Sequence, residues 1–137
     1  MTPRIATSLL FLAFMAAFAG TPSHAAEPVG TWLSQSGETK VKIAPCGTAL
    51  CGTVVWVKDG GTDKMNPDPA RAGRPLVGIQ MIYDVVKSGS GYKGSLYNYK
   101  DGGTYTGKLQ MLSDNQLKLS GCRMRVFCRS QTWTKSE

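Results

Sequence analysis

Residues 91–123 read GYKGSLYNYKDGGTYTGKLQMLSDNQLKLSGCR, and this stretch decides the fold. Within it, apolar and polar residues alternate, as at Leu117 and Leu119, and turn-forming clusters at 101–103 and 113–115 interrupt the alternation. A period of two is typical of half-buried β-strands, and clusters of Gly, Asn, Asp and Ser are typical of the turns between them. The stretch therefore predicts consecutive antiparallel strands joined by tight turns.

The same pattern extends over the rest of the chain, where no amphipathic helical segment of useful length is found. An up-and-down meander of this kind removes its unpaired edges by closing on itself. The sequence therefore predicts an all-β fold, an eight-stranded antiparallel up-and-down β-barrel. The eight expected strands are 29–35, 38–45, 50–58, 78–86, 91–100, 104–113, 115–123 and 126–135.

The N-terminus has the features of a secretory signal peptide. Arg4 supplies a positive charge, residues 9–19 form an apolar run of 11 residues, and Ser23 and Ala25 place small residues at a cleavage site after Ala25. The apolar run is shorter than the ~20 residues that a membrane-spanning helix needs. We therefore expect cleavage of residues 1–25, a single domain at 26–137, and a periplasmic or secreted protein that is not integral to the membrane.

Cleavage would remove His24, the only histidine of the chain, together with one of the 16 basic residues and none of the 9 acidic ones. The net charge would fall from +7 to +6. Loss of the imidazole excludes Ser-His-Asp triads, Cys-His dyads and imidazole metal sites. Since no other catalytic motif stands out, we expect a protein that is not an enzyme, with no cofactor and no metal site.

The four cysteines flank two of the predicted hairpins. Cys46 and Cys51 border the turn after the second strand, and Cys122 and Cys128 border the turn after the seventh. Residues that face each other across an antiparallel ladder have Cα atoms ~4.5–5.5 Å apart, a separation that suits a disulfide. Strand directions place the two hairpins at opposite ends of the barrel, so cross-pairing would have to span it. We therefore expect two local bonds, 46–51 and 122–128.

The connection at 59–77 is longer than the others, and its three prolines argue for an ordered loop between strands three and four. Asp68 is expected to pair with Arg71 or Arg74, while Asn66 and the prolines fix the turn. The functional interpretation of this loop is a rigid lid or a surface that docks a partner. The strand count places it at the end that carries the 122–128 hairpin, which we expect to be the open mouth of the barrel.

Several motifs resemble a known family when taken together. They are GTW at 30–32, which resembles the first lipocalin motif, CGTALCG at 46–52, NPDP at 66–69, R-x-x-R-P-L-x-G at 71–78, GTY at 103–105, GC at 121–122 and CRSQTW at 128–133. The combination is similar to the exported bacterial family known as domain of unknown function 2147. The resemblance implies a lipocalin-like barrel in the periplasm and no settled activity. It also implies a basic residue over the indole of Trp32, for which Arg129 and Lys135 are the candidates.

Aromatic side chains supply one part of the candidate ligand site. Trp32 and Trp133 are expected to lie close together near the closed end of the barrel. They would act there either as core residues or as the floor of a ligand pocket. Trp56, Tyr83, Tyr97 and Tyr105 could line the wall of that pocket or stand outside it, because a period of two does not decide which face of the sheet they occupy.

Polar side chains of the last strand supply the other part. Arg129 and Gln131 share a strand face with Trp133, so all three should point inward together. An inward Arg129 would pair with an Asp, contact a Trp ring, or receive the carboxylate or phosphate of a bound amphiphile.

Two functions follow from these patterns. The first is a periplasmic lipocalin-like carrier or sensor that binds a small apolar or amphipathic, lipid-like ligand. The second is a cell-envelope interaction module with a filled barrel that uses the 59–77 loop as its docking surface. The positive charge is either solvated surface or a match for an anionic envelope component such as a lipid headgroup. Nucleic acid is not an expected partner, since the basic residues are spread along the strands.

Overall fold

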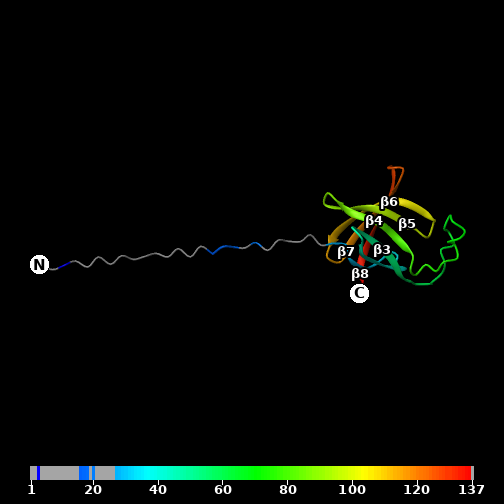
Figure 1. Cartoon of the computed structure of the whole chain (residues 1–137), viewed down its shortest axis with the longest axis horizontal. Helices are drawn as coiled ribbons and strands as arrows, with labels where there is room; N and C mark the ends of the chain where they lie inside the picture. Colours follow the sequence, from blue (N-terminus) through cyan, green and yellow to red (C-terminus); the bar gives the residue numbers. More distant parts are fainter. Residues whose placement is uncertain (1–2, 4–15, 19, 21–26, 137) are drawn as a thin grey trace.

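The computed structural model describes residues 3, 16–18, 20 and 27–136. The predicted signal peptide lies outside the described residues apart from five positions. The fold is a closed barrel in which each strand pairs with its sequence neighbours, as Figure 1 shows, and this confirms the predicted class. Among the described residues, no helix is long and apolar enough to cross a membrane. The strands are β1 (Gly30–Leu33), β2 (Thr39–Cys46), β3 (Ala49–Val57), β4 (Gln80–Ser88), β5 (Gly91–Asn98), β6 (Gly103–Ser113), β7 (Gln116–Arg123) and β8 (Phe127–Ser136).

Each strand begins and ends within two residues of its expected boundaries, and the differences at β1 and β4 have local reasons. β1 is shorter than expected because Ser34 already begins a turn, in which its carbonyl accepts a hydrogen bond from the Gly37 N–H at 2.9 Å. β4 begins later than expected, at Gln80, and it contains a bulge. At the bulge Asp84 has a φ of 51°, and the register with β5 shifts. Bulges of this kind add local twist, which helps a sheet to close into a barrel.

The pairing of β1 with β8 closes the barrel around a buried indole. Trp32 is fully buried, and its indole N–H donates to the Pro28 carbonyl at 3.0 Å. The ammonium of Lys135 lies 5.3 Å from the centre of the Trp32 ring and donates to the Val29 carbonyl at 3.2 Å. Of the two basic residues that the resemblance offered for this position, Lys135 therefore covers the indole and Arg129 does not.

The two disulfides are the predicted local ones, and they lie at opposite ends of the barrel. Cys46 and Cys51 join β2 to β3 with Cα atoms 5.8 Å apart, and Cys122 and Cys128 join β7 to β8 with Cα atoms 4.0 Å apart. The alternation of strand directions puts the β7–β8 hairpin at the same end as residues 58–79, the long connection. We call this the mouth end, and the end with the β2–β3 hairpin the closed end.

A buried carboxylate holds the long connection in place. Asp63 is fully buried and accepts hydrogen bonds from the Tyr97 hydroxyl at 2.6 Å, the Asn66 amide at 2.8 Å and the Arg74 guanidinium at 2.9 Å. Burial alone raises the pKa of Asp63, but these hydrogen bonds and the charge of Arg74 outweigh it and lower the pKa overall. Burial and the bond to Asp63 raise the pKa of Tyr97 to about 12. Because Tyr97 lies on β5, this network fastens the connection to the barrel.

The expected ion pair within the connection is present in one of its two forms. The carboxylate of Asp68 lies 3.5 Å from the Arg71 guanidinium, and both side chains are exposed. Arg74 pairs with the buried Asp63 instead of Asp68. The amide oxygen of Asn66 accepts from the Asp68 N–H at 2.9 Å, which fixes the turn as expected.

Replacement of the buried carboxylate tests this account. We expect Asp63→Asn to lower the free energy of unfolding by about 3 kcal/mol. The substitution removes the buried carboxylate charge and leaves the Arg74 guanidinium without its counter-charge. Urea unfolding at neutral pH measures the change. The control Asp68→Asn removes an exposed pair and should change the free energy of unfolding by less than about 0.5 kcal/mol.

The stability difference between wild type and Asp63→Asn should also depend on pH. A carboxyl group whose pKa is lowered by folding stabilises the fold above its unfolded-state pKa, and it loses that contribution as the pH falls through its folded-state pKa. The difference between wild type and Asp63→Asn should therefore be complete at neutral pH and shrink below about pH 4. A difference that stays constant into acid would contradict a lowered pKa at Asp63.

Candidate functional site

A cavity of about 790 Å³ opens at the mouth end of the barrel. Small-molecule sites in proteins usually enclose ~300–1,000 Å³, so this volume is in the range of a ligand pocket. Its lining comes from the turn after β1, the first residue of β2, β4 to β8, the turn after β5, and the β7–β8 hairpin. The barrel is therefore filled at the closed end and hollow at the mouth end.

The floor of the cavity is apolar. It includes Met81, Ile82, Leu96, Leu119 and Trp133, and the Trp133 side chain is almost wholly buried. The Trp133 indole N–H donates to the side-chain oxygen of Gln131 at 3.0 Å, so its polar atom is satisfied within the wall. The floor can therefore accept an apolar group without leaving a polar atom unpaired.

Two glycines preserve space above this floor. Gly107 and Gly121 face each other on β6 and β7. A β-carbon at Gly107 would lie 2.5 Å from Leu96 Cγ, and one at Gly121 would lie 3.4 Å from Tyr105 Cβ. Without side chains at these positions, Leu96 and Tyr105 can pack against the wall instead of filling the cavity.

Most of the charged groups at the rim are already paired. Lys100 donates to Glu38, and this contact lowers the pKa of Glu38 and raises that of Lys100. The Tyr105 hydroxyl donates to Asp101, and the guanidinium of Arg123 lies 4.8 Å from the centre of the Tyr105 ring. Burial raises the pKa of Asp101, but the bond from Tyr105 and the nearby arginine charges lower it overall.

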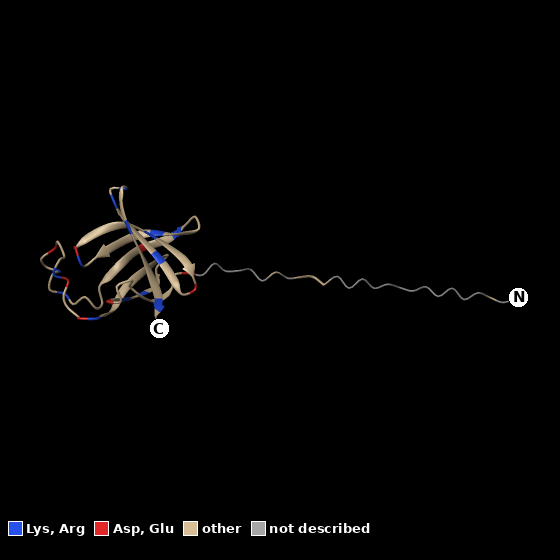
Figure 2. Ribbon diagram, turned by 180° about the vertical axis from the view of Figure 1, so that it is seen from behind, with Lys and Arg blue, Asp and Glu red and all other residues tan. Residues whose placement is uncertain are grey.

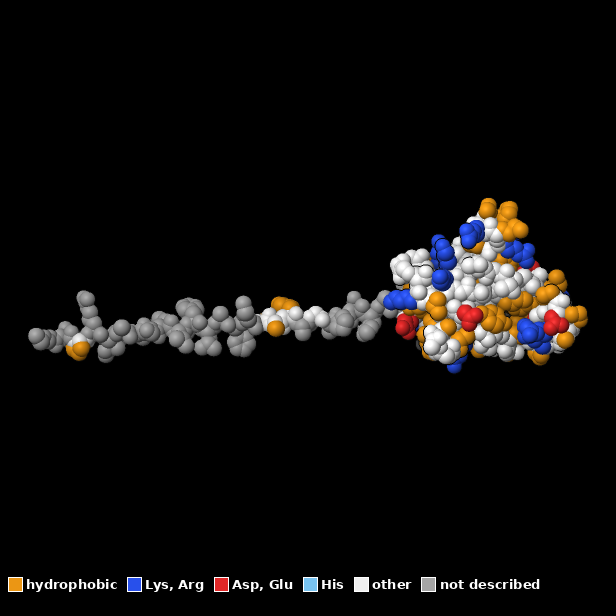
Figure 3. Space-filling model, turned by 45° about the horizontal axis from the view of Figure 1, so that its top comes forward, with side chains coloured by type: hydrophobic (Ala, Val, Ile, Leu, Met, Phe, Trp, Pro, Cys, Tyr) orange, Lys and Arg blue, Asp and Glu red, His pale blue; other side chains and the backbone are white. Residues whose placement is uncertain are grey.

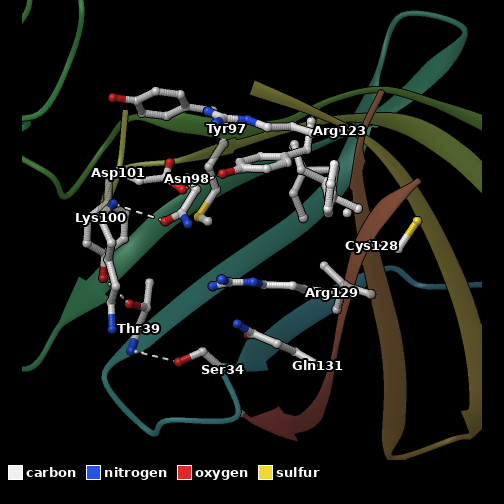
Figure 4. Close-up of a pocket in the computed structure, with 18 of the residues that line it drawn as sticks. Ser34, Thr39, Tyr97, Asn98, Lys100, Asp101, Arg123, Cys128, Arg129 and Gln131 are labelled. Atoms are coloured by element: carbon white, nitrogen blue, oxygen red, sulfur yellow. Dashed lines mark hydrogen bonds between the residues drawn. The ribbon is translucent and has the colours of Figure 1, made fainter. Parts of the chain in front are cut away.

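Arg129 differs from the other charged groups of the rim. It stands opposite Gly121 on the inward face of β8, and Figure 4 shows that it projects with Gln131 into the cavity, toward the side of Lys100 and Thr39. Among the residues that the structure describes, its side chain has no ion pair, no hydrogen bond and no aromatic ring beneath it. Of the three partners considered for Arg129, the described chain supplies no Trp ring and no Asp within ion-pair distance, although the charge of Arg129 helps to lower the pKa of Asp101. Its charge remains available to a ligand.

The predicted site residues divide into two groups. The first group lines the cavity and consists of Tyr97, Tyr105, Arg129, Gln131 and Trp133. The other predicted residues do not line it, and they have different surroundings. Trp32 lies in the core beneath the cavity. Trp56 is half-exposed, and the Lys40 ammonium lies 5.6 Å from the centre of its ring. The Tyr83 hydroxyl donates to the Gln80 carbonyl. The loop residues Asn66, Asp68, Arg71 and Arg74 lie beside the mouth and not over it.

Several rim residues were missed by sequence reasoning. Arg123 could have been found, because it continues the inward series of Leu117, Leu119 and Gly121 at the same spacing of two. Lys100 and Asp101 lie in a turn, where no strand period indicates which way a side chain points. The pairing of β6 with β7 brings this turn beside the β7–β8 hairpin.

The chain matches a family and a solved structure. The family described as "Uncharacterized protein conserved in bacteria (DUF2147)" matches residues 30–135. None of the curated proteins compared with the chain matches it. A solved structure, protein HP1028 from the human pathogen Helicobacter pylori, described as belonging to the lipocalin family, resembles this fold with a TM-score of 0.73. The two sequences are 22% identical, and the likeness covers 82% of this chain and 85% of that one. At this identity the likeness shows the fold alone.

The bond between Tyr105 and Asp101 can be tested by titration. We expect Tyr105→Phe to raise the pKa of Asp101 toward its ordinary value, because the hydroxyl that stabilises the carboxylate is removed. Carboxyl carbon shifts followed by NMR across acid pH measure this. Tyr92→Phe, which alters a tyrosine outside the cavity lining, should leave the pKa of Asp101 unchanged. An unmoved Asp101 in the Tyr105 variant would show that the hydroxyl does not bind it in solution.

Proposed function

The chain belongs to the bacterial family of uncharacterized proteins DUF2147, and from the cavity of this member we propose that it binds a small amphipathic molecule with an anionic group. The apolar part of the ligand would enter the barrel above Trp133, and the anionic group would meet Arg129. The lipocalin-like fold suggests a ligand-binding barrel, since barrels of this size can hold one small ligand. The single observation that carries the proposal is a hollow mouth into which Arg129 projects with no ion pair, hydrogen bond or ring contact among the described residues.

The arrangement of polarity supports an amphiphile over a wholly apolar or wholly polar ligand. Aliphatic and aromatic side chains form the floor, and hydroxyl, amide and charged groups gather at the rim. A guanidinium binds carboxylate or phosphate through two parallel hydrogen bonds, and Gln131 beside it can add a third donor. The volume is large enough for a drug-sized or single-chain ligand.

The alternative of a filled barrel with the long connection as docking surface has less support. A filled barrel would have large side chains where the cavity lies, and Gly107 and Gly121 supply none. We also propose that the protein acts outside the cytoplasm, in the periplasm or beyond it. The two disulfides suggest an oxidising, exported environment, and the N-terminal sequence has the pattern of a secretory signal.

A pair of fluorescent probes tests the proposal. Anilinonaphthalene sulfonate is apolar with an anionic group, and N-phenyl-1-naphthylamine is its uncharged counterpart. Both should bind the wild type, and Arg129→Gln should weaken the anionic probe by about tenfold because a charge-assisted hydrogen bond is lost. The uncharged probe should bind the variant as it binds the wild type.

Two further variants make the result specific. Arg71→Gln removes an exposed charge on the long connection, outside the cavity, and should change neither affinity. Gly121→Leu adds bulk at the wall and should weaken both probes, with circular dichroism to check that the variant folds. Equal affinity of wild type and Arg129→Gln for the anionic probe would refute the role of Arg129. Absence of binding by either probe would count against a ligand pocket of this chemistry.

A further inference from the structure

The tip of the β7–β8 hairpin exposes apolar side chains to an unusual degree. Met124, Val126 and Phe127 have 87%, 76% and 72% of their surface exposed. Figure 1 shows the hairpin standing out from the barrel, and Figure 3 shows hydrophobic side chains gathered on the protruding tip beside basic ones. Single exposed apolar residues are common on soluble proteins, but a projecting cluster of this kind marks a contact surface.

The backbone of the tip is strained, and the exposed side chains at the strained positions do not offset this strain by packing within the fold. Met124 and Arg125 have φ angles of 53° and 61°, and the Val126 N–H bonds to the Arg123 carbonyl across them. A two-residue turn with both central φ angles positive normally has Asn or Gly at these places, since other residues are strained there by about 1–2 kcal/mol each. A long apolar side chain and a long basic one occupy the strained positions while pointing into solvent. This indicates that the side chains themselves are needed at the tip.

The charge around the tip is positive. Arg125 lies at the tip between Met124 and Val126, Arg123 precedes Met124, and residues 115–136 contain no acidic residue. None of these arginines forms an ion pair with another residue of the described chain. Figure 2 shows basic residues on the hairpin. A guanidinium binds phosphate oxygens in pairs, so the tip combines apolar anchors with groups that recognise phosphate.

We propose that the β7–β8 hairpin docks the protein on an anionic phospholipid surface. Met124, Val126 and Phe127 enter the boundary between headgroups and acyl chains, and Arg125, with Arg123 next to Met124, contacts lipid phosphates. The disulfide between Cys122 and Cys128 fixes the base of the hairpin. Binding therefore costs the tip little conformational entropy. This docking does not depend on the ligand proposed above.

A lipid surface fits the tip better than a protein partner does. A stable protein interface buries ~800 Å² on each side around a packed centre, and a narrow projecting turn offers little flat surface beside it. Insertion into a bilayer needs only a few apolar side chains with basic neighbours, which is what the tip provides. Arg123, Met124, Val126 and Phe127 also line the mouth of the cavity, so docking would place the mouth against the membrane.

Vesicle flotation with the disulfide-bonded protein tests the docking. The wild type should float with vesicles rich in phosphatidylglycerol, bind vesicles of phosphatidylcholine alone more weakly, and lose most of its binding at high salt. The variant Val126→Ser/Phe127→Ser should lower the partition coefficient by at least about tenfold, since two apolar anchors are lost. Both positions are exposed, so the fold should be unaffected.

Matched controls separate the tip from general surface chemistry. Leu112→Ser removes a half-exposed apolar side chain of β6, and Lys93→Gln removes an exposed charge of β5. Neither should change vesicle binding, whereas Arg125→Gln should lower it by about fivefold. A Phe127→Trp variant should in addition lose tryptophan fluorescence when the vesicles contain brominated acyl chains, which would place the tip within the bilayer.

The outcomes also separate this proposal from the proposed ligand. Arg125 does not line the cavity, so Arg125→Gln should leave binding of the anionic naphthalene probe unchanged. Loss of vesicle binding in this variant with normal probe binding would support docking even if the pocket proved to bind another class of ligand. Failure of the wild type to bind anionic vesicles, or equal binding by wild type and the tip variants, would overturn docking and leave the pocket untouched.

Discussion

The contact that the rest of the structure depends on is the one between Trp32 and Lys135. β1 has only four residues, and three of them pair with β8 to close the barrel. The buried indole gives this short seam an apolar anchor, while Lys135 covers the ring and reaches back to the chain before β1. Trp32 and the core residues around it fill the closed end of the barrel, so the empty volume lies at the mouth end.

Two polar networks at the mouth end have different consequences. The network around Asp63 is buried and complete, since each of its three donors reaches the same carboxylate. It fixes the long connection beside the barrel and leaves the mouth open. The rim network is exposed and incomplete. Lys100 and Asp101 have partners, and the guanidinium of Arg129 has none within the described residues, so the rim has an excess of positive charge directed inward.

Strand periodicity predicted most of the fold and part of the site. Alternation predicted eight strands, and closure with the local disulfides followed from the direction of each strand. The inward orientation of Arg129, Gln131 and Trp133 followed from the same period of two, because all three lie on one regular strand. The bulge at Asp84 could not be predicted, since it depends on the register with β5. The early end of β1 comes from a local turn between Ser34 and Gly37, which a period of two does not reveal.

The residues that sequence reasoning misjudged lie either in connections, where periodicity has no meaning, or on strands whose inward face the sequence did not reveal. Asp63 carries no local sign that it is buried, and its role appears only when Tyr97 of β5 is brought beside the long connection. Trp56 and Tyr83 are aromatic and lie on strands, but the sequence alone did not indicate which face they occupy. Charge pairing at the rim joins segments that are about 60 residues apart in the chain, as Lys100 and Glu38 show.

Gly107 and Gly121 make the width of the cavity depend on two positions, so a single substitution can change it. The room near the mouth exists because two facing positions lack a β-carbon, and no rearrangement of strands is needed to change it. A single codon change at either position would narrow the barrel. Within a family of such barrels, the residues at these two places would therefore let pocket width be read from sequence, and ligand size could diverge between members while the fold stays the same.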